Sequence, residues 1–127
     1  MNIHIIKVSL VGDHLRCTPH QCLIDADKKK EKTLIVWMLD ETLAEGEFLA
    51  VGNNIPSPGF QFDKKPPSGR FDPENLDTPK RHVSIMNSYH PGDQSDEWEY
   101  TLRVRDADGS NYETMTHRGN HPVIINR

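Results

Sequence analysis

Short apolar segments recur along this chain and are separated by Gly, Pro, Asn and Asp residues. No long segment repeats its apolar residues with the 3.6-residue period of an amphipathic helix, whereas several segments alternate apolar and polar residues as half-buried strands do. The pattern predicts an all-β fold, and 127 residues suffice for one such domain, residues 1–127. The predicted strands are 2–11, 21–25, 33–40, 47–52, 82–90, 97–105, 110–116 and 121–126.

The clearest strand lies in "DEWEYTLRVRDADGSNYET", residues 96–114. Its apolar side chains share one parity and its charged ones the other, as in a strand with one buried face. A two-residue loop at 108–109 would set apolar residues opposite charged ones. A three-residue loop, 107–109, instead sets apolar residues opposite each other and Arg103 opposite Glu113. The sequence therefore predicts a hairpin in which Val104 pairs with Tyr112 and Leu102 pairs with Thr114.

The D-x-D-G in this hairpin, which begins at Asp106, has an alternative interpretation as the start of a calcium-binding loop. A loop of the helix-loop-helix kind needs glycine at its sixth position and glutamate at its twelfth. Those positions hold Asn111 and His117. A turn explains the motif better, because Gly109 adopts a positive φ without steric cost.

Two predicted strands carry apolar residues on both parities. In 2–11, Ile3 and Ile5 lie on one face, and the apolar residues from Ile6 onward lie on the other. One core cannot bury both sets, so we predict a β-bulge or a strand that passes between sheets. The run "TLIVWML" at 33–39 predicts a central strand. A helix over 28–45 is the alternative, but a run of Ile, Val and Trp favours the strand.

Prolines are concentrated in residues 53–81. A loop of this length without regular structure is unusual in a small domain, and it is either functional or a packed connection. We predict an extended, mostly irregular crossover between two sheets. Its apolar anchors are Phe60, Phe62, Phe71 and Leu76.

The pattern D-x-W-x-Y-x-L, formed by Asp96, Trp98, Tyr100 and Leu102, resembles the immunoglobulin-type D-x-[AG]-x-Y-x-C motif. The resemblance implies a tyrosine corner, in which the Tyr100 hydroxyl bonds back to the backbone. Trp37 is likewise similar to the buried tryptophan of that architecture. Leu102 stands where the motif has cysteine, which excludes an intersheet disulfide at this place.

The C-terminal third contains Y-x-L-x-V-x-D…G-x-x-Y, from Tyr100 to Tyr112, followed by "HPVIIN" at 121–126. Together these segments resemble the small bacterial proteins of the DP-EP family, which are β-sandwich proteins without an assigned activity. The resemblance implies an immunoglobulin-like antiparallel β-sandwich of seven to eight strands. It implies no reaction, because a fold does not define a function.

Charge and segment length exclude two classes of partner. A formal charge of -4 and a pI near 5.9 argue against nucleic acid, and the one basic run, Lys28–Lys30, is flanked by acidic residues. The N-terminus lacks the layout of a signal peptide, and the longest apolar run, 34–39, is too short to span a membrane. Two cysteines do not make a disulfide framework. We therefore expect a cytoplasmic protein.

Two groups of residues could bind a metal ion. "HLRCTPHQC" contains two imidazoles and two thiols, which zinc accepts in a tetrahedron, although the spacing matches no standard zinc motif. The alternatives are a polar loop with a half-buried cysteine, or a redox pair of the two cysteines. This candidate zinc site comprises His14, Cys17, His20 and Cys22. The second group, near the C-terminus, could bind an anion or a metal, and an ordinary loop between strands is the alternative. It comprises His117, Arg118, Asn120 and His121.

The chain contains no phosphate-binding loop, dinucleotide fingerprint or H-E-x-x-H motif, and the group Ser88, His90 and Asp93 lacks a nucleophile elbow. We therefore predict a non-catalytic binding or assembly module. We expect it to be a homo-oligomer, because an apolar edge strand such as 121–126 needs covering. A metal-binding protein is the alternative, and a small enzyme of unrecognised type is a third.

Overall fold

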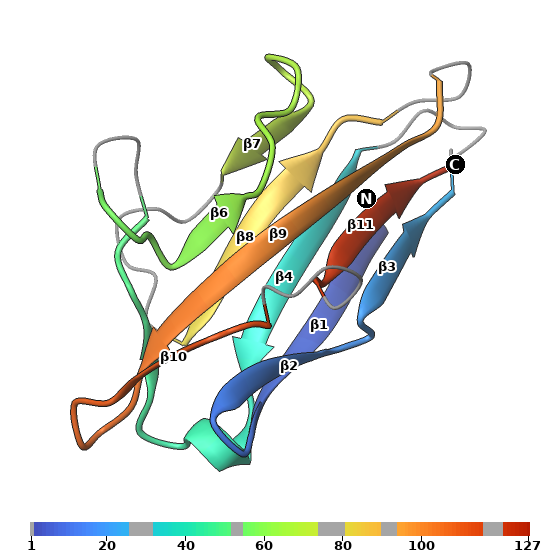
Figure 1. The fold of residues 1–127 in the computed structure, drawn as a ribbon. Helices are drawn as coiled ribbons and strands as arrows, with labels where there is room; N and C mark the ends of the chain where they lie inside the picture. The colour runs from blue at the N-terminus through green and yellow to red at the C-terminus, as the bar shows by residue number, and fades with distance from the viewer. Residues whose placement is uncertain (1, 26–31, 52–54, 74–80, 90–93, 116–120) are drawn as a thin grey trace.

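The computed structural model of the chain describes residues 2–25, 32–51, 55–73, 81–89, 94–115 and 121–127. These residues form two β-sheets and one short 3-10 helix, η1 (Glu41–Leu43), with no α-helix among them (Figure 1). The predicted all-β fold of two layers is confirmed. The strands are β1 (Asn2–Val11), β2 (His14–Thr18), β3 (Gln21–Ile24), β4 (Thr33–Leu39), β5 (Glu47–Phe48), β6 (Phe60–Phe62), β7 (Phe71–Pro73), β8 (His82–Asn87), β9 (Asp96–Arg105), β10 (Asn111–Glu113) and β11 (Val123–Asn126).

The first sheet has five strands in the order β2-β1-β4-β8-β7. Its central pair, β1 and β4, is parallel, whereas the sequence predicted an antiparallel sandwich. The reason is topological: the chain leaves this sheet after β2, forms β3 in the second sheet, and returns beside β1 in the same direction (Figure 1). The second sheet repeats the feature, because β3 and β11 are also parallel.

The second sheet is built around β9, the longest strand of that sheet. β5 and β6 pair with β9, and so do β10 and β11. β11 lies between β9 and β3, so the prediction that 121–126 is an uncovered edge strand is wrong. A single bridge between Leu15 and Thr114 connects β2 to this sheet.

The core lies between the sheets and is centred on Trp37. β4 alternates buried and less buried residues, and Ile35, Trp37 and Leu39 face inward, as expected for a strand and not for the alternative helix. Trp37 is fully buried, and its Nε1 donates a hydrogen bond of 2.9 Å to the hydroxyl of Tyr100 on β9. That hydroxyl therefore bonds across the core to a side chain, where the sequence predicted a bond to the backbone.

The predicted β9–β10 hairpin is confirmed residue by residue. Val104 pairs with Tyr112 and Arg103 with Glu113, and the amide of Thr114 donates to the Leu102 carbonyl at 3.1 Å. The loop residue Gly109 has a φ of 84°, as the three-residue loop requires. The D-x-D-G motif is a turn between strands in this structure.

β1 is one continuous strand, so the predicted bulge or sheet switch is wrong. Its pairing with β4 runs without interruption from Asn2 to Val8, and its pairing with β2 continues to Val11. Ile6 and Val8 are fully buried. The conflict of parity is resolved by leaving Ile3 and Ile5 in solvent.

The described part of 53–81 crosses from the second sheet to the first, as predicted. β6 pairs with β9, and β7 pairs with β8, so the segment between them passes from one layer to the other (Figure 1). Phe60 is buried, and Phe62 and Phe71 are half-buried against the core. Leu76 lies outside the described residues. The crossover is therefore anchored at both ends by short strands.

Candidate functional site

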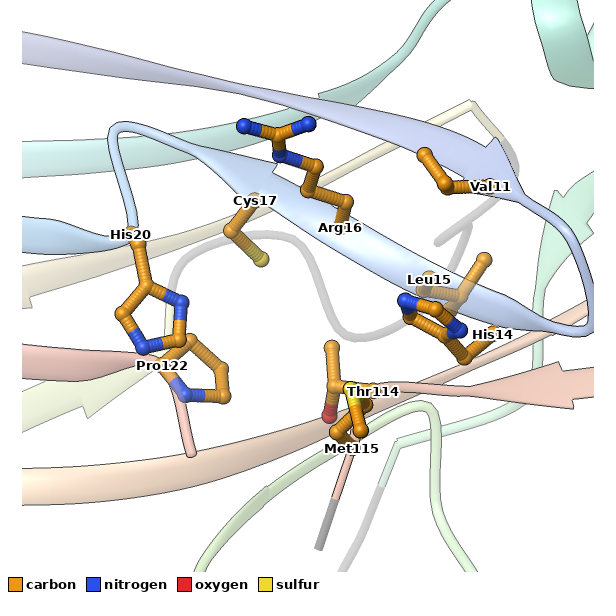
Figure 2. Close-up of a pocket in the computed structure, with 9 residues that line it drawn as sticks. All are labelled: Val11, His14, Leu15, Arg16, Cys17, His20, Thr114, Met115 and Pro122. Atoms are coloured by element: carbon orange, nitrogen blue, oxygen red, sulfur yellow. The ribbon is translucent and has the colours of Figure 1, made fainter. Parts of the chain in front are cut away.

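The four residues of the candidate zinc site lie on both sides of a sheet-to-sheet connection. "HLRCT", interpreted from the sequence as polar, is strand β2, and β3 follows in the other sheet. His14, Cys17 and His20 line one cavity of about 260 Å³ beneath β2, and Cys22 is not among its lining residues (Figure 2). Within the described ranges, the metal-ligand atoms that gather closely belong to a different group, Asp63, Glu99 and His121. The structure thus brings three of the four residues to one cavity without grouping them as ligands.

Both cysteines are buried thiols. Burial raises the pKa of Cys17 to about 12 and the pKa of Cys22 to about 11, from an ordinary value of 9.0. A hydrogen bond between Cys17 and the Tyr100 hydroxyl lowers the former slightly. The thiolate, not the thiol, binds metals and attacks disulfides, and these environments disfavour it at neutral pH.

The raised thiol pKa values predict a loss of stability in alkaline solution. Above pH 9.0 the unfolded chain releases thiol protons that the folded protein retains, so the free energy of unfolding should fall between pH 9 and pH 11. The slope expected is about 1.4 kcal/mol per pH unit and thiol. Urea titrations at pH 8 and at pH 10 measure it. Cys22→Ala should show a shallower fall than wild type, and equal slopes would contradict the prediction.

Of the C-terminal group, His121 belongs to a cluster with two carboxylates, while His117, Arg118 and Asn120 lie outside the described residues. The Nδ1 atom of His121 is 2.5 Å from Oδ2 of Asp63 and 3.9 Å from Oε2 of Glu99. The His121 side chain is 17% exposed, that of Asp63 26% and that of Glu99 53%. The cluster therefore lies at the surface with its imidazole the most buried member.

Three segments place these groups on the outer face of β9. Asp63 directly follows β6, and its amide donates a hydrogen bond of 3.0 Å to the Glu99 carbonyl. On the other side of β9, the amide of Tyr100 donates to the Pro122 carbonyl at 3.1 Å, which fixes the residue beside His121. Sequence analysis missed Asp63 and Glu99, because they are two acidic residues among nineteen, 36 positions apart.

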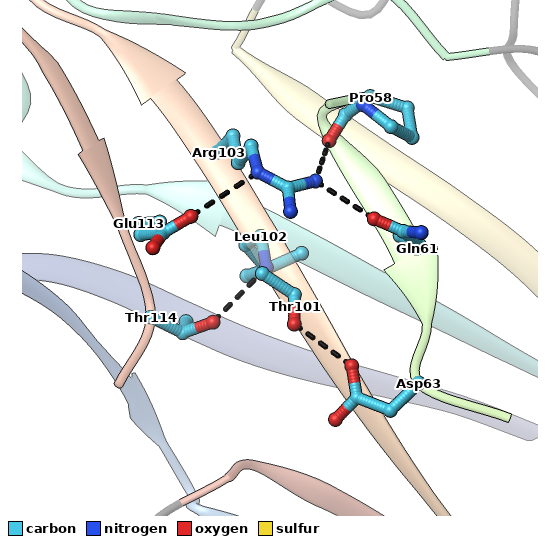
Figure 3. A network of polar contacts seen from close by, with 8 residues as sticks. All are labelled: Pro58, Gln61, Asp63, Thr101, Leu102, Arg103, Glu113 and Thr114. Carbon is cyan, nitrogen blue, oxygen red and sulfur yellow. Dashed lines mark hydrogen bonds and ion pairs between the residues drawn. The ribbon is translucent and has the colours of Figure 1, made fainter. Parts of the chain in front are cut away.

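Two side chains of β9, Thr101 and Arg103, form hydrogen bonds next to this cluster (Figure 3). Thr101 Oγ1 donates a hydrogen bond of 2.8 Å to Oδ1 of Asp63. Arg103 is engaged further along the strand, with Glu113 at 3.2 Å and with the Gln61 side-chain oxygen at 2.9 Å. The one guanidinium in this view is thus directed to other partners.

The outer face of the first sheet is a second candidate surface, and its apolar side chains gather on β1 and β4. Ile3 and Ile5 are 58% and 61% exposed, and Met38 on the neighbouring strand is 45% exposed. The β1–β4 register places Ile3 beside Leu34 and Ile5 beside Val36. We call this surface the β1 face. It comprises Ile3, Ile5, Leu34, Val36, Met38 and Met86.

Part of β1 is also an open sheet edge. β2 pairs only with residues 7–11, and β4 pairs with residues 2–8 on the other side. The Val8 carbonyl accepts a hydrogen bond from the amide of Asp40, which follows β4. Since the backbone groups of successive residues point to alternate sides, those of Ile3 and Ile5 point away from β4. No described strand pairs with residues 2–6 on that side.

Comparison with known proteins adds no relative. No family model, no curated protein and no solved structure matches this chain. In the described segments, no helix is both long and apolar enough to cross a bilayer. Function must therefore be inferred from the surfaces and clusters described above.

Proposed function

We propose that the protein is a non-catalytic assembly module that self-associates through the open edge of β1. One observation carries the proposal: Ile3 and Ile5, the most exposed large apolar residues among those described, stand where no described strand pairs with the outer edge of β1. An exposed, apolar and unpaired edge is a template for pairing with another strand. A second copy of the chain supplies a strand that fits it.

The fit follows from two-fold symmetry. If two copies of β1 pair antiparallel about His4, Ile3 of each copy stands opposite Ile5 of the other. The outward backbone groups of both residues then meet as hydrogen-bonded pairs. Their side chains also join on one side of the sheet, because they share a parity. The β1 faces of the two copies become one continuous surface, which is typical of an interface built by strand addition.

The energy of this pairing is modest. Two pairs of residues supply four hydrogen bonds, each worth about 1 kcal/mol net. Partial burial of four isoleucines adds about 1 kcal/mol each, at the usual value for apolar area. Because association itself costs several kcal/mol, a reversible dimer is expected. Concentration should therefore control the assembly.

The fold family and the cellular location are also part of this proposal. We infer an immunoglobulin-like sandwich related to the DP-EP family. The C-terminal motif from Tyr100 to Tyr112 supports this inference. A cytoplasmic location is supported by Cys17 and Cys22, which are both free, as thiols are in a reducing compartment. Because the DP-EP proteins are bacterial, this resemblance also supports a bacterial source for the chain.

Substituting Ile5 tests the assembly directly. Ile5→Lys should leave the fold intact, since the side chain is exposed, and should weaken self-association at least about tenfold by removing apolar contact. Sedimentation velocity across a concentration series measures the effect. Val11→Lys is the matched control, because Val11 is 40% exposed on the same face but lies where β2 already covers the edge.

A proline variant separates edge pairing from packing through the face. Ile5→Pro and Ile5→Ala both shorten the apolar side chain, but only Ile5→Pro also removes the outward amide, which edge strands tolerate. Ile5→Pro should therefore abolish the dimer, whereas Ile5→Ala should only weaken it. Circular dichroism verifies that each variant is folded. A wild-type chain that stays monomeric at high concentration, or a dimer unaffected by Ile5→Pro, would refute pairing through β1.

A further inference from the structure

We propose that Asp63, Glu99 and His121 form a binding site for a divalent transition-metal ion. The three side chains come from different segments: the residue after β6, β9 and the residue before Pro122. The site lies on the second sheet, so it is independent of the assembly proposed for β1 in the first. One ligand atom from each residue lies within 4.8 Å of the others.

That spacing is close to what one ion requires. Zinc binds imidazole nitrogen and carboxylate oxygen at about 2.0–2.2 Å, so two ligands of a tetrahedral ion are roughly 3.5 Å apart. His121 Nδ1 stands 2.5 Å from Asp63 Oδ2 and 3.9 Å from Glu99 Oε2. The Glu99 side chain is 53% exposed, so it has room to turn toward the ion. The two less exposed ligand atoms, which now contact each other, would separate by about 1 Å to admit the ion.

The backbone around the site is fixed by sheet pairing. Phe62 pairs with Tyr100, so Asp63 stands opposite Glu99 on one side of β9. Val123 pairs with Glu99 on the other side, and the antiparallel register brings His121 opposite Thr101. Glu99 and Thr101 share one parity of β9. The three ligands therefore lie at neighbouring register positions: Glu99 is within β9, and Asp63 and His121 directly flank the segments that pair with β9.

Thr101 orients one ligand. Thr101 is buried, and its hydroxyl donates to Oδ1 of Asp63 (Figure 3). The other oxygen, Oδ2, is the one that contacts His121. Outer hydrogen bonds of this kind orient metal ligands, and losing one typically weakens affinity by about 10- to 100-fold. Thr101 is thus a positioning residue for the site.

The charge of the cluster favours a cation. Two carboxylates and a neutral imidazole sum to a charge of -2, which a divalent ion neutralises. Across the described residues, neither Asp63 nor Glu99 forms an ion pair with a lysine or an arginine. Arg103, the nearest guanidinium along β9, is bound to Glu113 and Gln61. The competing interpretation is an ion pair between a protonated His121 and the two carboxylates.

The donor atoms select the class of metal. One imidazole nitrogen with carboxylate oxygens and no thiolate suits Zn²⁺ or Mn²⁺. Ca²⁺ and Mg²⁺ prefer oxygen ligands only, so they should bind more weakly here. Because Glu99 faces solvent, water completes the coordination of the ion.

Titration calorimetry with Zn²⁺ on untagged, metal-free protein tests the site. We expect one Zn²⁺ per chain. Asp63→Asn keeps an oxygen that can accept from Thr101 but removes the carboxylate charge. Glu99→Gln changes an exposed side chain. Each variant should weaken Zn²⁺ binding at least about tenfold. Asp72→Asn, on the exposed residue of β7, and His14→Gln, in the cavity beneath β2, should leave binding unchanged.

Thr101→Val refines the test. Valine has nearly the shape of threonine, so the Thr101→Val variant should fold, but its Zn²⁺ affinity should fall about tenfold because the hydroxyl is lost. Thr101→Ser keeps the hydroxyl and should keep the affinity. Amide spectra recorded with Mn²⁺ should show broadening centred on Asp63, Glu99 and His121. No Zn²⁺ binding by wild type, equal binding by Asp63→Asn and Glu99→Gln, or loss of binding in His14→Gln would overturn the proposal and leave the ion pair.

Discussion

Replacing Trp37 with alanine is expected to lower the free energy of unfolding by about 4 kcal/mol, the largest effect of any single substitution proposed. Trp37 is fully buried at the centre of β4, and its ring lies 4.8 Å from that of Phe60 and 5.1 Å from that of Tyr100. Removing the indole opens a cavity between both sheets and takes the donor from the Tyr100 hydroxyl. Small domains have only about 5–15 kcal/mol of stability in total.

Trp37→Phe separates the hydrogen bond from the packing. It retains an aromatic ring but leaves the buried Tyr100 hydroxyl without the indole donor, at a cost of about 1–3 kcal/mol. Trp98→Phe is the control, since Nε1 of the half-buried Trp98 has no hydrogen-bond partner in the described part of the chain. It should cost less than about 1 kcal/mol. Urea titration followed by far-ultraviolet circular dichroism measures all three variants, and equal losses in the two phenylalanine variants would contradict this account.

The features that the sequence predicted well are local. The β9–β10 hairpin was fixed in register because alternation and turn chemistry both act within twenty residues, and Gly109 satisfied the turn. The crossover at 53–81 was recognisable for a similar reason, since its prolines exclude long strands and its phenylalanines need a core. Each of these predictions depended on neighbours along the chain.

What the sequence did not predict depends on distant partners. The parallel pairing of β1 with β4 arises because β3 joins the other sheet, and no local pattern records that choice. The parity rule for β1 assumed that both apolar sets had to be buried. The structure leaves Ile3 and Ile5 exposed instead, which a single chain considered alone could not suggest.

The candidate sites show the same division. His14, Cys17, His20 and Cys22 are adjacent in sequence, but successive residues of a strand point to opposite faces, and the two thiols turn into the core. The Asp63, Glu99 and His121 cluster joins positions up to 58 residues apart, and only the pairing of three strands makes it visible. Closeness along the chain was therefore a poor guide to shared chemistry.

A buried polar chain between the sheets is the second determinant of stability, and Asn126 is its centre. Asn87 Nδ2 of β8 donates to Asn126 Oδ1 of β11 at 2.7 Å, and Asn126 Nδ2 donates to Asp96 Oδ1 of β9 at 2.8 Å. Arg70 binds the other oxygen of Asp96 and extends the chain to the crossover. Asn126 is fully buried and Asn87 is 1% exposed, so water cannot replace these partners.

Asn126→Ala is therefore expected to cost about 3 kcal/mol, since it leaves the Asn87 amide and one oxygen of Asp96 without a partner, each worth about 1–3 kcal/mol. Asn111→Ala, on the exposed strand β10, is the matched control and should change stability by less than about 0.5 kcal/mol. Urea midpoints give both values. Because Asn87 and Asn126 satisfy each other, the double variant Asn87→Ala/Asn126→Ala should lose less than the sum of the two single losses by about 1 kcal/mol or more. Strict additivity would mean that the hydrogen bond between Asn87 and Asn126 does not couple the two sheets.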